Sequence, residues 1–287
     1  MRFLLVCFLF LTSLCQASSS LKVYPLTNDP IDVVLVTHPK DKETLDMCID
    51  GIRTWGENIG RVIVVSSEPL SENAEWFNEA GYPFSKDDVA FQIGREDSRV
   101  AKEFFARGGH PVGWYYQQLL KLYAAYVIPD ISPNVLVIDS DSVFINPVRF
   151  LDDQNGGLLC YSDRKSTKSH YVAHAQRMLP SYSQVYPEVN SVNHHMLFQK
   201  PILDDMFEEI ETFHNMPLWK VFCRCVDLSR KWGSGSEYEL YYNFALTHTN
   251  QVSIRNLKRR ASSTLSALKQ YQDEGYVLVS FHSYMRK

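Results

Sequence analysis

Asn134-Val-Leu-Val-Ile-Asp-Ser-Asp-Ser-Val-Phe144 joins an apolar run to two carboxylates, Asp139 and Asp141, which are one residue apart. Val135 to Ile138 are aliphatic and mostly β-branched, as is typical of a central strand covered on both faces. Ligands of open α/β sheets gather beyond the carboxyl ends of the strands. The stretch therefore predicts a buried strand that ends at a binding site.

The two carboxylates at this strand end predict a metal ion. They repel each other, and burying both without compensation costs several kcal/mol or raises a pKa. A divalent cation removes the conflict, and oxygen ligands favour Mg²⁺ or Mn²⁺, which keep open positions for phosphate oxygens. The same residues also fit a strand-to-turn exit, in which Asp139 caps a backbone N–H group and Asp141 is solvated.

Length and composition indicate a large globular domain. The 287 residues are 45% hydrophobic and 13% aromatic, which is enough for one α/β domain with a full core. The net charge of -4 and the pI near 6.1 give no clustered positive charge for tracking phosphates, so we expect no nucleic-acid partner.

The N-terminus has the pattern of an export signal. Arg2 precedes a nearly uninterrupted apolar run from Phe3 to Leu14, and Cys15-Gln16-Ala17 follows. The run is shorter than the roughly 20 residues of a membrane span. We therefore predict a signal peptide over residues 1–17, with an uncleaved short anchor as the alternative and a lipid-attached Cys15 as a third reading. Export would place the protein in a periplasm, outside the cell or in a secretory lumen, with membrane contact only through an uncleaved anchor.

Four cysteines remain after this leader: Cys48, Cys160, Cys223 and Cys225. In an oxidising compartment they allow up to two disulfides, with three connectivities. Cys223 and Cys225 are too close and too isolated for a zinc site, which favours structural cysteines.

Strand and helix patterns alternate along the first half of the chain and predict a βαβαβαβ order. Apolar runs predict strands, and apolar residues at helical spacing predict helices. The expected strands before the Asp-x-Asp strand are Ile31 to Thr37, Arg61 to Ser66 and Val89 to Ile93; the expected helices run from about Leu45 to near Gly56 and from Trp114 to Val127. The glycine motifs of dinucleotide binders and P-loops are absent, so a nucleotide would be held by strand ends and a metal.

The second half is less regular, and no linker separates it from the first. The expected strands are Leu158 to Tyr161, Met196 to Phe198 and Tyr276 to Phe281, and the expected helices are Pro201 to Phe213 and Tyr238 to Thr247. This order suits an α/β domain whose second part builds an acceptor pocket.

Six motifs together resemble the GT-A-type glycosyltransferase superfamily, close to a group of mostly uncharacterised bacterial and viral proteins. They occur in this order: Val33-Val-Leu-Val-Thr-His38, Gly113-Trp-Tyr-Tyr-Gln-Gln-Leu-Leu-Lys-Leu122, Asp139-Ser-Asp141, Asn193-His-His195, Ser236-Glu-Tyr-Glu239 and Phe281-His-Ser283. The resemblance covers nearly all of the mature chain. It implies a single GT-A-like α/β domain over residues 18–287, with a central mixed, mostly parallel sheet flanked by helices.

The resemblance also implies an activity, the transfer of a sugar from a UDP- or GDP-linked donor to a hydroxyl of a glycan, lipid or protein. Mn²⁺ or Mg²⁺ would bridge the Asp-x-Asp carboxylates to the diphosphate and neutralise the leaving group. By analogy with the superfamily, Asp141 is expected as a direct metal ligand and Asp139 as a contact of ribose or metal. His282 is expected to complete the metal shell.

Four further residues are expected to contact the donor together with Asp139: Thr37, His38, Gln117 and Lys121. Gln117 and Lys121 are one helical turn apart and share a face. Lys121 is expected to reach the diphosphate or to pair with Asp139, and the alternative is a surface lysine with a buried stem. Arg95 and Arg99 are read as solvated loop charges that would otherwise add phosphate contacts.

The acceptor side needs a carboxylate base if the reaction inverts the anomeric centre. Glu237 and Glu239 are the candidates, with Asp163 as a weaker one, although Glu237 also fits a first-turn residue favoured by the helix dipole. Asn193, His194 and His195 are expected to line the acceptor pocket, and strand alternation would turn the two histidines to opposite faces. Trp114 is expected either to stack on a sugar or to belong to the core.

Two other functional classes stay open. Ile138-Asp-Ser-Asp-Ser-Val-Phe144 also fits the first motif of haloacid-dehalogenase-like phosphatases, in which the first Asp is the nucleophile. Those enzymes usually carry the motif on their first strand, whereas here it lies in mid-chain. The second alternative is a non-catalytic secreted protein of the same fold that binds a sugar or a metal.

Overall fold

The structure is a computed structural model that describes residues 21–108, 111–161, 167–230, 234–282 and 285. The predicted leader, residues 1–17, lies outside these ranges, so its cleavage and the export that it implies stay predictions. Within the described ranges, no helix combines the length and the apolar character that a membrane crossing requires.

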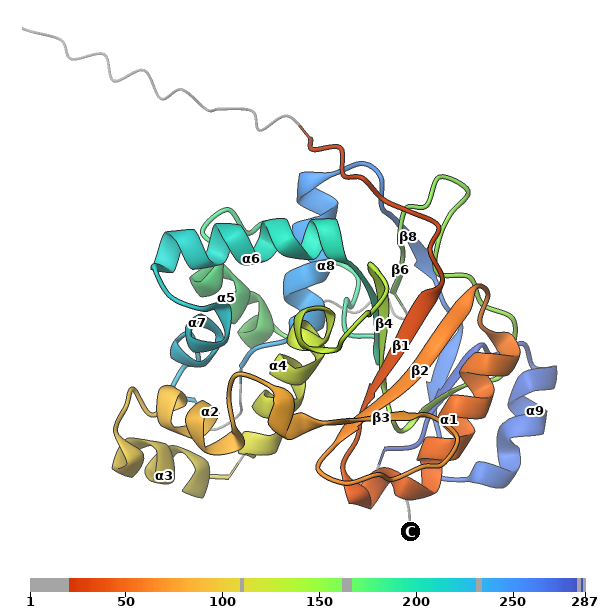
Figure 1. The fold of residues 1–287 in the computed structure, drawn as a ribbon, viewed down its shortest axis with the longest axis horizontal. Coiled ribbons are helices and arrows are strands. Elements are labelled where there is room, and N and C mark those ends of the chain that lie inside the picture. The colour runs from red at the N-terminus through yellow and green to blue at the C-terminus, as the bar shows by residue number, and fades with distance from the viewer. Residues whose placement is uncertain (1–20, 109–110, 162–166, 231–233, 283–284, 286–287) are drawn as a thin grey trace, which may run out of the picture.

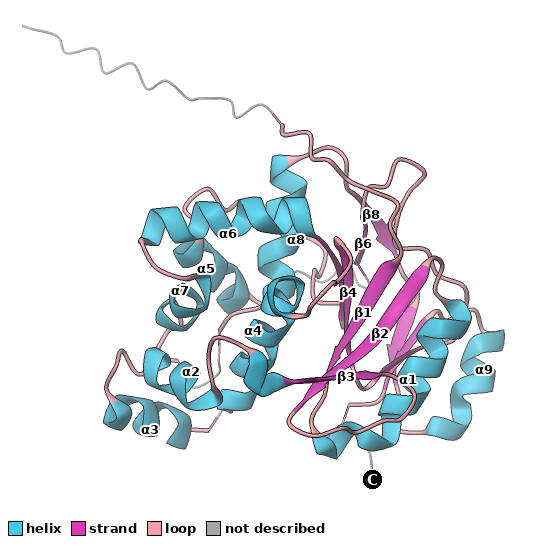
Figure 2. Cartoon of the chain, in the orientation of Figure 1, coloured by secondary structure: helices cyan, strands magenta, loops and turns pink. Residues whose placement is uncertain are grey.

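A five-stranded sheet forms the centre of the fold, with the order β3-β2-β1-β4-β7. Its strands are β1 Ile31–Val36, β2 Ile59–Ser66, β3 Glu75–Asn78, β4 Asn134–Asp139 and β7 His195–Gln199. β1, β2, β3 and β4 are parallel, and β7 runs antiparallel to β4. This confirms the predicted mixed, mostly parallel sheet flanked by helices (Figure 2).

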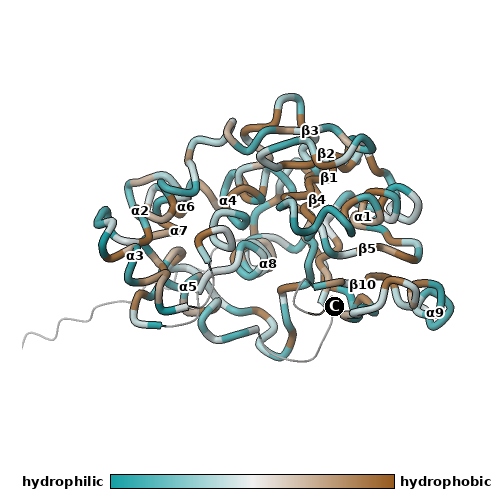
Figure 3. Tube along the Cα trace, turned by 90° about the horizontal axis from the view of Figure 1, so that it is seen from below, coloured by the Kyte–Doolittle hydropathy of each residue, from teal (hydrophilic) through white to brown (hydrophobic). Residues whose placement is uncertain are grey.

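The sheet has an apolar core on each face because successive side chains of a strand point to opposite faces. In β1, Val34 and Val36 belong to one core, while Val33 and Leu35 belong to the other. The tube in Figure 3 is brown, and therefore hydrophobic, along β1 and β2. Burial on both faces explains why these strands read as continuous apolar runs in the sequence.

A helical layer covers the face that carries Val34 and Val36, to the left of the sheet in Figure 1. It contains α2 Lys86–Ile93, α3 Ser98–Ala106, α4 Val112–Val127, α5 Ser169–Met178, α6 Lys200–His214, α7 Leu218–Arg224 and α8 Glu237–His248. The predicted helices of these regions are confirmed in α4, α6 and α8, with ends shifted by up to two residues.

Helix α1, Lys42–Trp55, and a three-stranded sheet cover the opposite face. That sheet has the order β5-β10-β9, with β5 Ser142–Phe144, β9 Arg259–Ala261 and β10 Leu278–Ser280. Gly51 allows α1 to approach β5 closely, because a Cβ atom there would lie 2.6 Å from the carbonyl oxygen of Phe144. The contact fixes the chain directly after the Asp-x-Asp motif against α1.

The remaining elements lie at the periphery. β6 Leu158–Tyr161 pairs in parallel with β8 Ser253–Asn256, and α9 Leu268–Asp273 precedes β10 in the chain. Three short 3-10 helices complete the described chain: η1 Pro39–Asp41, η2 Glu79–Gly81 and η3 Leu265–Ala267.

The predicted strand from Val89 to Ile93 is wrong, because these residues end helix α2. A reciprocal capping box of Ser85 and Asp88 starts that helix, and Val89 and Ile93 then lie one turn apart on its buried side. The third parallel strand is β3 instead, an edge strand with largely exposed side chains. The βαβαβαβ order of the first half is therefore also wrong.

All four cysteines of the described chain are buried free thiols, so the disulfides allowed by the sequence do not form. Cys48 lies on α1 with its Sγ 3.0 Å from the carbonyl oxygens of both Ser140 and Ser142. Burial raises the pKa of this thiol well above its usual range.

Candidate metal and donor site

The candidate site lies where the carboxyl ends of β1 and β4 meet the start of β7. Asp139 is the last residue of β4, and strand register places it beside Val36 of β1. Two backbone hydrogen bonds fix the loops: Asp139 N donates to His194 O at 2.9 Å, and Phe281 N donates to Asp141 O at 2.6 Å. The topology thus brings three segments far apart in sequence to one strand end.

Asp141, His194 and His282 form a group with metal-binding geometry, since one ligand atom of each lies within 4.8 Å of the others. His282 Nδ1 is 3.1 Å from Asp141 Oδ2, and the rings of His194 and His282 are 4.9 Å apart. One carboxylate and two imidazoles suit Mn²⁺ and other transition-metal dications better than Mg²⁺, which prefers oxygen ligands. This donor set fits a dication with further coordination positions open.

His194 has a left-handed backbone, with φ of 63°, which is uncommon outside glycine. Its Nδ1 is 2.8 Å from Asp139 Oδ2, so Asp139 holds both the ring and, through the backbone bond, the carbonyl of this residue. Constrained backbone of this kind concentrates at functional sites. His194 was expected on the acceptor side, and the structure places it with the candidate metal ligands.

His195 is the first residue of β7, and its ring lies away from the candidate metal ligands. Its ring is buried against the rings of Phe144 and Phe150, and burial lowers the pKa of His195 to about 3. The adjacent Asn193 is also buried, with its amide donating to the carbonyl oxygens of Cys160 and Asn190. Both residues therefore belong to the interior beneath the site.

Asp139 is in contact with three side chains. Its Oδ1 accepts from Lys121 Nζ and, at 3.1 Å, from the hydroxyl of Tyr238, while its Oδ2 contacts His194. Burial alone would raise the pKa of this carboxyl, but Lys121 and His194 lower it well below its ordinary range. Asp139 is consequently an ionised carboxylate with three partners.

Lys121 projects from α4 and is buried, so it is not the surface lysine of the alternative reading. Nζ donates to Glu237 Oε1 at 2.8 Å and to the hydroxyl of Tyr238 at 3.0 Å, in addition to Asp139. Burial would lower the pKa of Lys121, but Asp139 and Glu237 raise it well above its ordinary value. The predicted pairing with Asp139 is thus present in the structure.

The start of α8 supplies the two candidate base residues. Ser236 caps the helix by accepting from Glu239 N, and Glu237 N donates to Gln118 Oε1 at 3.2 Å. Burial raises the pKa of Glu237, although Lys121 opposes the shift. Glu239 accepts from the hydroxyls of Tyr182 and Ser191, and Asp163 lies outside the described residues. Both described carboxylates are engaged within the protein.

The residues predicted to bind the donor divide into two groups. Thr37 is buried directly after β1, and Gln117 donates from Nε2 to Val36 O at 3.2 Å, which places both beside the strand end. His38 is exposed and caps η1. Trp114, expected either to stack on a sugar or to belong to the core, stacks on Tyr171 with ring centroids 6.0 Å apart, within the helical layer.

Arg95 and Arg99, interpreted from the sequence as solvated loop charges with phosphate contacts as the alternative, both bind nearby groups of the protein. Arg95 donates to the carbonyl oxygens of Ile93, Cys223 and Val226, and is therefore structural. Arg99 is exposed and pairs with Asp97.

Sequence reasoning missed two supports of the site. Thr44 Oγ1 donates to Ser140 O at 3.0 Å and joins Cys48 in holding the Asp-x-Asp loop. Tyr238 bridges Lys121 and Asp139. In the sequence, its position between two glutamates at a predicted helix start was the one feature that pointed to this role. Neither residue type stands out in a sequence, because a hydroxyl gains such a role only from its neighbours.

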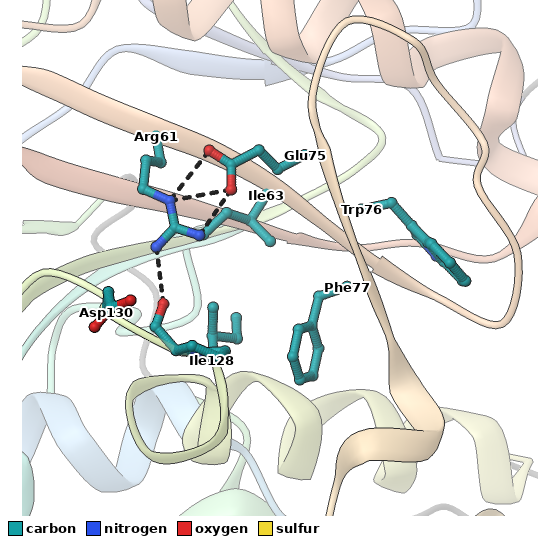
Figure 4. Close-up of a pocket in the computed structure, with 8 residues that line it drawn as sticks. Arg61, Ile63, Glu75, Trp76, Phe77, Ile128 and Asp130 are labelled. Atoms are coloured by element: carbon teal, nitrogen blue, oxygen red, sulfur yellow. Dashed lines mark hydrogen bonds and ion pairs between the residues drawn. The ribbon is translucent and has the colours of Figure 1, made fainter.

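A hollow of about 360 Å³ lies at the other end of the sheet, near the start of β2 and β3. Figure 4 shows Arg61 and Glu75 directed toward each other there, with Asp130 and Phe77 on other sides of the hollow. Arg61 Nη2 is 2.7 Å from Glu75 Oε2, and Arg61 Nη1 donates to Pro129 O at 3.0 Å. Its lining contains none of the candidate metal ligands.

The fold belongs to a class that solved glycosyltransferases share. The mannosyltransferase Ktr4p from S. cerevisiae is similar with a TM-score of 0.50 and 10% identity, over 82% of this chain and 73% of that one. Mouse xyloside xylosyltransferase 1 has a TM-score of 0.39 and 13% identity, over 88% of this chain and 97% of that one. An active-site mutant of LgtC has a TM-score of 0.43 and 11% identity, over 87% of this chain and 86% of that one. At such identities the likeness concerns the fold alone.

The chain itself belongs to a protein family described as "Family of unknown function (DUF6492)", which it matches over residues 18–278. No curated protein matches its sequence.

Proposed function

We propose that the protein is a metal-dependent glycosyltransferase that moves a sugar from a nucleoside-diphosphate donor to a hydroxyl of a glycan, lipid or protein. The observation that carries the proposal is the convergence of Asp141, His194 and His282 at the carboxyl ends of parallel strands. Ligands of open α/β sheets bind at this edge. The likeness in fold to a mannosyltransferase supports the same class of reaction.

The donor atoms of the site favour Mn²⁺ over Mg²⁺ as the partner of the diphosphate. Asp141, His194 and His282 would hold the ion, and the bound ion would supply charge neutralisation for the departing nucleoside diphosphate. The loop that carries Asp141 is fixed from below by Thr44 and Cys48, so one of the three ligands is held before the ion binds.

The residues around the ion have separate tasks in this proposal. Thr37 and Gln117 stand at the end of β1, where they would form the floor of the donor pocket. Glu237 and Glu239 each keep existing partners, so taking a proton from the acceptor would require one of them to leave those partners. Glu237 is linked to the site through Lys121, which binds both Glu237 and Asp139.

The phosphatase alternative is less well supported. It requires Asp139 to attack phosphorus through a carboxylate oxygen, whereas both oxygens accept hydrogen bonds from Lys121, Tyr238 and His194. The motif also lies on the fourth strand of the chain. A non-catalytic binding role is separated from catalysis by the experiment below.

Calorimetric titration with UDP and then GDP, with and without Mn²⁺, tests the donor site. We expect one nucleotide to bind only when Mn²⁺ is present, and Asp141→Ala to abolish that binding. Asp50→Asn, a change on the exposed side of α1, serves as the matched control. Sugar conjugates of the bound nucleotide are then assayed for hydrolysis and transfer; binding without turnover would favour the non-catalytic role, and no binding would contradict the proposal.

A further inference from the structure

We propose that Asp139 does not bind the metal but acts as a positioning residue, which orients His194 as a ligand and is itself held in place by Lys121, Tyr238 and Glu237. The inference rests on the metal site of the proposed function. It assigns different roles to the two carboxylates of the Asp-x-Asp motif.

The hydrogen bonds of Asp139 carry the first step. Oδ1 accepts from Lys121 and Tyr238, and Oδ2 contacts His194 Nδ1 at 2.8 Å. Three of the roughly four lone-pair positions of this carboxylate are therefore in use, and their donors fix its orientation. Asp141 has no such commitment: beyond its contact with His282, its described side-chain partner is the neighbouring Ser142 hydroxyl at 3.2 Å.

The geometry of His194 carries the second step. An imidazole whose Nδ1 donates to a carboxylate has its proton fixed on that nitrogen, and Nε2 keeps the lone pair that a metal requires. Asp139 also binds the carbonyl oxygen of His194 through its own backbone N–H, at 2.9 Å. One residue therefore sets both the left-handed backbone and the ring of His194.

The buried cluster beneath Asp139 carries the third step. Each of the three Nζ–H donors of Lys121 has an acceptor: Asp139, Glu237 and the hydroxyl of Tyr238. That hydroxyl in turn donates to Asp139 and closes the ring of contacts. Glu237 provides a second negative charge for Lys121, which keeps the ammonium group under the site rather than in solvent.

Counting the imidazole nitrogens bound to Mn²⁺ tests the inference without any turnover. Electron spin-echo envelope modulation on the full chain should detect two imidazole nitrogens in the wild type and in Asp139→Asn, but one in His194→Ala. Mn²⁺ titration, followed by the resonance of the free ion, should show about 10- to 100-fold weaker binding in Asp139→Asn, as expected for an orienting partner.

Further variants separate positioning from direct ligation. Asp141→Asn should weaken Mn²⁺ binding more than Asp139→Asn does, Tyr238→Phe should weaken it less, and Asp50→Asn should leave it unchanged. Circular dichroism establishes that each variant is folded; if His194→Ala is not, His194→Gln takes its place.

Two outcomes would contradict these expectations. If the wild type shows a single imidazole nitrogen bound to Mn²⁺, and His194→Ala keeps it, the inference is overturned while the metal site stands. Absence of Mn²⁺ binding in the wild type would overturn the metal site itself.

Discussion

Two cations, each beside two carboxylates, lie at opposite ends of the central sheet, and the cations differ in burial. At the carboxyl end, Lys121 joins Asp139 and Glu237; at the amino end, Arg61 joins Glu75 and lies 3.9 Å from Asp32. The side chain of Lys121 is 3% exposed and that of Glu237 4%, against 35% for Arg61 and 53% for Glu75.

The comparison shows that burial, rather than charge, decides what such a pairing does. Exposed ion pairs contribute about 0–1 kcal/mol, while removing one partner of a buried pair costs about 3–5 kcal/mol. The buried cluster also touches a group of histidines and a second carboxylate, through the contact of Asp139 with His194. Only the buried pairing is therefore coupled to a candidate site.

The largest expected effect is that of Lys121→Met. It leaves Asp139 and Glu237 buried without their cation, so we expect the free energy of unfolding to fall by about 3–5 kcal/mol. Urea denaturation measures this loss. Arg61→Met is the matched control at the other end of the sheet and should change stability by about 1 kcal/mol or less. Equal losses in the two variants would break the comparison.

The next effect is stabilisation by metal at one end only. A ligand that binds the folded state alone, at 100 times its Kd, stabilises it by about 2.7 kcal/mol. We expect Mn²⁺ to raise the Tm of the wild type and of Arg61→Met, and EDTA to reverse the increase. His282→Ala should lose most of this response. An undiminished Mn²⁺ shift in His282→Ala would place the ion elsewhere.

The two glutamates should respond to pH in opposite directions. Burial raises the pKa of Glu237, so its contribution to stability is present below its unfolded pKa, near 4.5, and is lost as pH rises through the folded value. The hydrogen bond from Arg61 lowers the pKa of Glu75, so that contribution is present above about 4.5 and is lost as pH falls.

Glutamine variants at both positions measure this difference. Relative to the wild type, Glu237→Gln should gain stability as pH rises from 4.5 to 7. Glu75→Gln should lose stability as pH rises toward 4.5, by a smaller amount because its side chain is half exposed. Chemical denaturation at pH 3.5, 4.5, 5.5 and 7 records both trends, and trends of the same sign would refute the assignment.

The smallest effect concerns the exposed pair alone. A double-mutant cycle with Arg61→Ala and Glu75→Ala should give a coupling energy of about 0.2–1 kcal/mol, which added salt reduces. Mn²⁺ affinity should be the same in all four proteins of the cycle. A coupling energy above about 2 kcal/mol would show that exposure does not separate the two ends.

Much of the fold was predictable because burial on both faces makes a strand read as an apolar run. Apolar runs predicted β1, β2 and β4 within two residues of their ends. Helix α4 was predicted to the same accuracy from its aromatic-rich helical pattern. β3 was missed because an edge strand needs no apolar pattern, and its exposed Trp76 and Glu75 resemble a loop. The prediction of a strand from Val89 to Ile93 failed because one buried turn of a helix can be as apolar as a short strand.

The site was predictable where chain order alone defines it. Asp139 and Asp141 follow a buried strand, and Lys121 shares a face of its helix with Gln117, so their proximity to the strand end could be inferred. The position of His194 could not be inferred from the sequence, because it depends on a left-handed backbone and on the antiparallel pairing of β7 with β4. The engagement of Glu237 by Lys121 likewise depends on packing between two helices that are distant in sequence.

The four buried thiols make the protein its own reporter of opening. Without a covalent crosslink among them, each becomes reactive only when its surroundings separate, so a thiol reagent applied under native conditions measures the rate of local unfolding. The labelling rate of Cys48 would report how fast the loop at Ser140 opens. The labelling rate of Cys223 would report how fast the helical layer opens. Slower labelling of Cys48 alone, in the presence of Mn²⁺, would show that the ion acts as a latch on that loop.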